Sequence, residues 1–143
     1  MKLKLLLLAV SFSFFKPTQA QTMREEIEAV MTVCNYYMDG GTHGDSVMFS
    51  KAFYPGGLMH YMRNDTVMVV SLKDFMARAR NNGEKTDRKT KIESVQVFGN
   101  AATATLTIEY PTFYFRDIMS LLKTKEGWKI VSKIFYREEK KKE

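Results

Sequence analysis

Residues 89–110, KTKIESVQVFGNAATATLTIEY, decide the fold of this chain. In the second half of the segment, Ala, Ala, Leu, Ile and Tyr alternate with Thr, Thr, Thr and Glu. A period of two is typical of a β-strand that buries one face and exposes the other. Gly99-Asn100, between the two apolar runs, is a two-residue hairpin signal. The segment therefore predicts a pair of long antiparallel strands, 89–98 and 101–110.

Two further hairpins are predicted on either side of this pair. Each consists of two β-rich runs separated by residues that favour turns. One hairpin joins strands 58–62 and 66–70 through Arg63-Asn64-Asp65, and the other joins strands 113–123 and 128–136 through Lys125-Glu126-Gly127.

Helical periodicity marks the first part of the chain. Apolar residues at three- and four-residue steps predict a helix over 23–38. Thr22 and Glu25 have the spacing of a capping box at its start, and Gly40-Gly41 is expected to end it. The members of the stripe are Ile27, Val30, Met31, Cys34 and Met38.

Two shorter helices are predicted next. The second begins at Thr42 or Asp45 and ends at Pro55-Gly56-Gly57. The third is capped by Ser71, with Asp74 at its third position, and ends at Asn81-Asn82-Gly83. The apolar faces are Val47, Met48, Ala52 and Phe53 in the second helix, and Leu72, Phe75, Met76 and Ala79 in the third. Helices segregated ahead of a large antiparallel sheet predict an α+β fold, a curved sheet packed against about three N-terminal helices with a cavity between the layers.

The first twenty residues predict a secretory signal peptide. Lys2 and Lys4 precede an apolar run that is shorter than the roughly 20 residues of a spanning helix. Cleavage is expected after Ala20, which leaves a single domain over 21–137 and a charged tail over 138–143. The protein is thus expected to be secreted or periplasmic, without a membrane anchor after cleavage.

Charge and cysteine usage argue against a nucleic-acid-binding protein and against a reactive thiol. The chain carries 22 basic and 16 acidic residues, but three of the lysines lie in the signal segment and much of the remaining excess lies in the tail. No basic stripe is interleaved with aromatic residues, so nucleic-acid binding is not expected. Cys34, the single cysteine, lies in the helical stripe and is expected to be a buried small hydrophobe.

Several motifs, taken together and in order, resemble one family. Tyr37-Met38-Asp39-Gly40 is similar to its helix-ending "Y-x-D-G", and the segment 99–104 is similar to its "G-[DN]-x-A-x-A". Residues 115–123 followed by 127–133 resemble its closing strands, "F-x-D-x-L-x-L-x-K…G-x-W-K-I-V-x-K", with Met119 as a departure. The chain resembles the secreted, putative lumazine-binding (SnoaL-like) proteins of the nuclear-transport-factor-two-like superfamily. The resemblance implies a cone-shaped, cystatin-like sheet around an apolar pocket, and frequent homodimerisation through the open sheet face.

Proton-transfer chemistry is a second reading, because some members of this superfamily are isomerases, dehydratases or cyclases. Its candidate groups are His60, Asp39 and Asp117. His60 would serve as a base only if it faced inward, and Asp117 is also expected to pair with Lys133 on the adjacent strand, since an unpaired buried carboxylate is costly. The resemblance to ketosteroid-isomerase-like enzymes places Cys34 and Tyr61 where a tyrosine and a carboxylate base are needed. That mechanism is therefore not expected.

We accordingly expect an exported domain that binds a small apolar or aromatic ligand, with no cofactor and no metal site. The alternatives are the proton-transfer enzyme and a homodimeric interaction module whose cone is filled by its own methionine and aromatic side chains. The expected pocket residues are Tyr36, Tyr37, Phe53, His60, Phe75, Phe113, Phe115 and Trp128.

Overall fold

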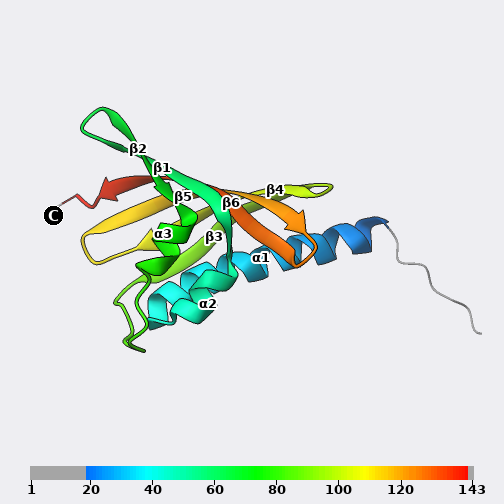
Figure 1. Cartoon of the computed structure of the whole chain (residues 1–143), viewed down its shortest axis with the longest axis horizontal. Coiled ribbons are helices and arrows are strands. Elements are labelled where there is room, and N and C mark those ends of the chain that lie inside the picture. The colour runs from blue at the N-terminus through cyan, green and yellow to red at the C-terminus, as the bar shows by residue number, and fades with distance from the viewer. Residues whose placement is uncertain (1–18, 142–143) are drawn as a thin grey trace, which may run out of the picture.

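The computed structural model describes residues 19–141, which form three helices and six strands (Figure 1). The predicted signal segment lies outside the described residues except for its last two positions, which open the first helix. The elements are α1 Gln19–His43, α2 Ser46–Lys51, β1 Phe53–Arg63, β2 Thr66–Ser71, α3 Leu72–Ala77, β3 Lys89–Phe98, β4 Ala101–Glu109, β5 Phe113–Thr124 and β6 Gly127–Glu139.

The six strands form one sheet in the order β2-β1-β6-β5-β4-β3. Four of the five neighbouring pairs are antiparallel, but β1 and β6 run parallel. The sheet is therefore mixed, where an antiparallel one was predicted. A parallel pair needs a long crossover, and here α3 and strands β2 to β5 supply it.

The helices cover one face of the sheet (Figure 1). Every second residue of β4 faces the helices, as predicted: Ala102, Ala104, Leu106 and Ile108 are all buried. Cys34 is buried against this layer, also as predicted. The α+β prediction is confirmed, with a core between α1 and the sheet and the opposite sheet face uncovered.

The three predicted hairpin turns are present. Asn64 and Asp65 connect β1 to β2 with φ of 46° and 61°. These paired positive values suit the right-handed twist of a tight hairpin, and Asn and Asp tolerate them. Gly99, with φ of 62°, opens the two-residue turn between β3 and β4, and Gly127 follows the turn between β5 and β6.

The boundaries of α1 differ from the prediction. The helix includes Thr22, which therefore does not cap it, and it continues through Gly40-Gly41 to His43. Both glycines serve close packing instead of helix termination. A Cβ at Gly40 would lie 2.4 Å from the backbone nitrogen of Phe49, and one at Gly41 would lie 2.4 Å from an Arg88 nitrogen. Arg88 approaches there to donate to the Met38 carbonyl, at 2.8 Å.

The predicted end of the second helix is also wrong. It ends at Lys51, and Phe53 and Pro55-Gly56-Gly57 belong to β1, whose pairing with β6 is irregular between Phe53 and Leu58. A Cβ at Gly57 would lie 2.3 Å from the Val131 carbonyl oxygen. These residues thus form a strand irregularity that lets two backbones approach closely.

The second and third helices, α2 and α3, begin at their predicted caps. Asp45 accepts a hydrogen bond from the backbone nitrogen of Met48, and Ser71 accepts one from that of Asp74, at 2.8 and 3.0 Å. The third helix ends at Ala77, however, earlier than predicted.

The last strand is longer than predicted, because β6 continues to Glu139. Lys140 then donates its backbone N–H to the Thr112 carbonyl at 2.9 Å.

No helix within residues 19–141 is both long and apolar enough to cross a membrane.

Candidate functional site

Three polar side chains meet between α1 and the sheet. Tyr37 of α1 donates its hydroxyl to Asp117 Oδ2 on β5 at 2.8 Å, and Lys133 of β6 forms an ion pair with Asp117 Oδ1. Lys133 Nζ also donates to the Tyr37 hydroxyl at 3.3 Å. Tyr37, Asp117 and Lys133 are 5%, 1% and 3% exposed, so all three are buried. The predicted pairing of Asp117 with Lys133 is confirmed.

Burial shifts the pKa values of Tyr37 and Lys133 in this triad. It raises the pKa of Tyr37 well above its usual range, and the negative charge of Asp117 raises it further. The phenol therefore remains a donor. Burial also lowers the pKa of Lys133, whereas the adjacent carboxylate opposes that change. The Lys133 ammonium has three N–H donors; it forms an ion pair with Asp117 and donates to the Tyr37 hydroxyl.

Lys133 and Tyr37 also line a small cavity. The cavity has a volume of about 100 Å³ and is lined, apart from Lys133 and Tyr37, by Met59, Phe75, Phe115 and Phe135. The Lys133 ammonium lies 5.0 Å from the centroid of the Phe135 ring and 5.1 Å from that of Tyr37. Its immediate surroundings beyond the triad are therefore aromatic and apolar.

A larger chamber of about 550 Å³ continues the small cavity toward solvent and shares its four apolar lining residues. Aromatic packing supports the wall that carries Phe75. The centroid of its ring lies 5.3 Å from that of Phe49 and 5.6 Å from that of Phe53. The charged lining residues of the chamber are three arginines, Arg63, Arg78 and Arg137. The arrangement has an apolar interior, one buried cation at its base and three cations at its opening.

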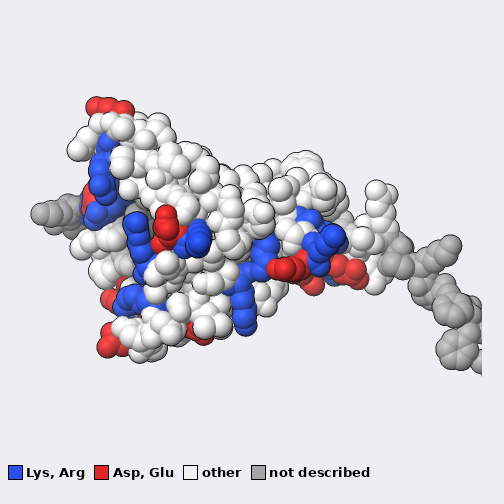
Figure 2. Space-filling model, viewed as in Figure 1, with Lys and Arg blue, Asp and Glu red and all other residues white. Residues whose placement is uncertain are grey.

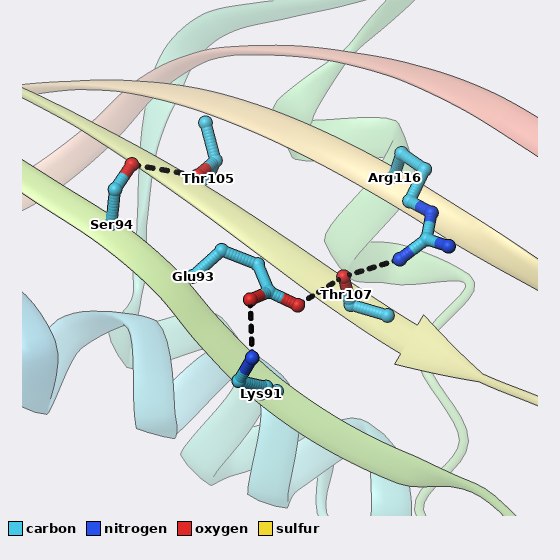
Figure 3. Close-up of polar contacts among 6 residues, drawn as sticks. All are labelled: Lys91, Glu93, Ser94, Thr105, Thr107 and Arg116. Atoms are coloured by element: carbon cyan, nitrogen blue, oxygen red, sulfur yellow. Dashed lines mark hydrogen bonds and ion pairs between the residues drawn. The ribbon is translucent and has the colours of Figure 1, made fainter.

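A second hollow of about 550 Å³ lies on the uncovered sheet face. A polar strip borders it (Figure 3): Thr107 donates to Glu93 Oε1 at 2.8 Å and accepts from Arg116 at 2.9 Å. Glu93 is the extra residue of a β3 irregularity between Ile92 and Ser94. Hydrogen bonds from Lys91 and Thr107 lower the pKa of the Glu93 carboxyl.

The exposed apolar side chains of this outer face lie beside that strip. Six of them are between 45% and 68% exposed: Met62, Val67, Val69, Ile118, Ile134 and Tyr136.

Comparisons with known proteins identify the family. A family model described as "Putative lumazine-binding" matches residues 25–136. The chain belongs to the putative lumazine-binding family. Among curated proteins, none matches it.

Solved structures similar to this family member carry the nuclear-transport-factor-two-like (NTF2-like) fold. An NTF2-like protein of unknown function from Shewanella baltica OS155 is 24% identical, with a TM-score of 0.71, covering 85% of this chain and 98% of that one. One from Silicibacter pomeroyi DSS-3 is 23% identical, with a TM-score of 0.69 and coverage of 80% and 97%. One from Methylobacillus flagellatus KT is 26% identical, with a TM-score of 0.68 and coverage of 79% and 92%.

The cavity of this putative lumazine-binding protein contains some of the predicted pocket residues. Tyr37, Phe75 and Phe115 line it, whereas Phe53 is buried in the aromatic cluster behind the wall. Phe113 stacks on Tyr110 at 4.6 Å. Tyr36 is only partly buried and lies under the Lys51 ammonium, 5.8 Å from it.

Trp128 serves a different contact. Its indole nitrogen donates to Glu26 Oε2 at 2.8 Å, which ties β6 to α1.

The predicted proton-transfer group is not assembled. His60 faces the outer side of the sheet, where it lines the outer hollow, because its neighbours Met59 and Tyr61 turn toward the helices. Asp39 is exposed on α1, where its backbone oxygen lies 3.0 Å from His43 Nδ1. Asp117 alone of the three lies in the buried site.

Several residues that line the cavity or its opening were not among the predicted pocket residues. Met59 and Phe135 line the cavity, and Arg63, Arg78 and Arg137 surround its opening. Period two on β6 places Phe135 on the same face as Lys133, so the predicted Asp117–Lys133 pair was a signal for it. Within residues 19–141, no three His, Cys, Asp or Glu side chains converge as metal ligands would.

Proposed function

We propose that this chain is an exported, homodimeric small-molecule-binding protein whose ligand occupies the cavity between the helices and the inner face of the sheet. The single observation that carries the proposal is the position of Lys133, a buried cation that lines an apolar cavity next to the larger chamber. An ammonium group has three N–H donors, and a ligand oxygen in the cavity would accept a hydrogen bond from this one. Export is supported by the charged and apolar pattern of residues 1–20.

The size and lining of the cavity fit this role. Pockets for small molecules are usually about 300–1,000 Å³, apolar, with few polar groups, and the chamber of about 550 Å³ is within that range. A cone filled by its own side chains would leave no such chamber. The self-filled interaction module is therefore less well supported than ligand binding.

Proton transfer is also less well supported. It needs a base that reaches the substrate and whose pKa lies near the working pH. His60 and Asp39 lie away from the cavity, and Asp117 is neutralised by Lys133 and hydrogen-bonded by Tyr37. The inner site therefore favours recognition over acid–base catalysis.

The homodimer is proposed to form through the outer sheet face. Its apolar side chains are too numerous and too contiguous for an ordinary exposed surface. The adjacent strip contains both Glu93 and Arg116, so a two-fold related copy could present opposite charges to it. A second copy of the chain is therefore the occupant proposed for this face.

Binding of a neutral fluorescent dye, N-phenyl-1-naphthylamine, tests the proposal. Ala79 lines the chamber opening, and Ala79→Phe should block entry and abolish the fluorescence increase. Ile118→Thr, on the outer face, is the matched control and should leave dye binding unchanged. Circular dichroism melts would establish that both variants fold. Dye binding that is lost in Ile118→Thr but retained in Ala79→Phe would place the site on the outer face and refute the proposal.

A further inference from the structure

We infer that the ligand is an organic anion, with an apolar body inside the cavity and a carboxylate, sulfonate or phosphate group held by Arg63, Arg78 and Arg137 at its opening. This inference rests on the proposed function, because it specifies the ligand of the same cavity. Three positive charges surround the opening, and among the described residues only Arg137 has an acidic partner.

The three arginines converge from distant parts of the chain. Arg63 ends β1, Arg78 caps the end of α3, and Arg137 lies near the end of β6. All three line the same chamber, and no carboxylate of the described residues lines it with them. Figure 2 shows several basic side chains at this end of the molecule, between the β1–β2 hairpin and α3, with acidic side chains beside them.

Two of the guanidinium groups have no acidic partner. Within residues 19–141, neither Arg63 nor Arg78 forms an ion pair, whereas Arg137 pairs with the exposed Glu139 at 3.0 Å. Arg137 also lies over the Phe113 ring, 4.1 Å from its centroid, and Arg63 lies 5.8 Å from that of Tyr61. Stacking of this kind orients a guanidinium while leaving its N–H groups available to a planar oxyanion.

The base of the cavity adds a second recognition element. The Lys133 ammonium lines it, beside Met59, Phe75 and Phe115. A ligand that fits both ends has an oxygen acceptor or an extended electron-rich body at its inner end, an apolar middle and an acidic group at the opening. Like-signed charge at both ends of an apolar cavity raises its potential and disfavours cationic ligands.

A pair of dyes that differ in one acidic group tests the inference. 8-Anilinonaphthalene-1-sulfonate has the ring system of N-phenyl-1-naphthylamine plus a sulfonate. Wild-type protein should bind the sulfonate at least about tenfold more tightly, the effect expected of one good charge-assisted contact. Its affinity should fall as salt rises, with little change for the neutral dye.

The arginine variants identify the site. Arg63→Gln, Arg78→Gln and the triple variant with Arg137→Gln should progressively weaken binding of the sulfonate, while the affinity for the neutral dye stays within about twofold. Arg24→Gln, an exposed arginine on the first turns of α1, is the matched control and should change neither.

The possible outcomes separate the two proposals. Equal affinity of the wild type for both dyes, or a triple variant that still prefers the sulfonate, would overturn the anion inference and leave the cavity proposal standing. Failure of both dyes to bind would overturn both.

Discussion

Lys133 on β6 and Asp117 on β5 lie diagonally across neighbouring strands, with their charged side chains 4% and 0% exposed. Lys133 is paired with Met119 across the two strands, and Asp117 is paired with Phe135. The two residues are thus offset by two positions, and both side chains point to the same, helix-covered face. A buried ion pair contributes little over apolar packing, but the loss of one partner is costly, because the other charge remains buried.

Lys133→Met should therefore destabilise the protein by about 3–5 kcal/mol. The double variant Lys133→Met/Asp117→Leu should recover much of this loss. The free energy of unfolding from urea titration measures both. Lys123→Met removes an exposed partner of Glu26 and, as the control, should cost less than about 1 kcal/mol. A double variant less stable than Lys133→Met would contradict the account.

A Cβ at Gly40 should separate α1 from α2. Gly40→Ala normally favours a helix by about 1 kcal/mol, but here the added carbon would lie 2.4 Å from the Phe49 backbone nitrogen. We expect a net destabilisation of about 1–3 kcal/mol, as for other overpacked sites. Asp39→Ala, at the exposed neighbouring position, should change the stability by less than about 0.5 kcal/mol. A stabilised Gly40→Ala protein would show that the helices do not approach as described.

Cys34 should make stability depend on alkaline pH. Burial raises the pKa of its thiol from 9.0 to about 12. A raised folded-state pKa means that the stabilisation is complete below pH 9 and is lost as pH rises toward 12. The free-energy difference between wild type and Cys34→Ala should shrink there by up to about 1.4 kcal/mol per pH unit. Tyr37 and Lys133 titrate in both proteins, so their contributions to this free-energy difference cancel. A difference that stays constant from pH 8 to 10.5 would disprove the burial effect.

The outer face should control the oligomeric state. Ile134→Lys places a charge among the exposed apolar side chains and should give a monomer at micromolar concentration, measured by light scattering after gel filtration. Phe98 is 67% exposed at the end of β3, away from this patch, so Phe98→Lys should remain dimeric. If both variants keep the mass of the wild type, the proposed interface is incorrect.

The sequence predicts the sheet well because its signals are local. Period two on β4 identifies the buried face, and the turn residues at 64–65 and 99–100 have the backbone preferences that their hairpins need. The Asp117–Lys133 pair follows from the same reasoning, since neighbouring antiparallel strands bring same-face residues together.

The remaining features depend on contacts between distant segments. Gly40-Gly41 normally ends a helix, but here the missing Cβ atoms admit Phe49 and Arg88. The strand around His60 is apolar on both faces, so its pattern does not indicate which side His60 occupies. Tyr37 lies 80 residues from Asp117 in the chain, and no local pattern predicts that they are bonded.

Native mass spectrometry of the protein, exported and gently purified, tests the central claim most directly. The wild-type protein should be a dimer that carries a reproducible extra mass from an acidic small molecule. Ala79→Phe should give a dimer without this mass, while Ile118→Thr should retain it. Bare protein of the calculated mass in the wild type, with no organic anion bound even when one is added, would contradict the account.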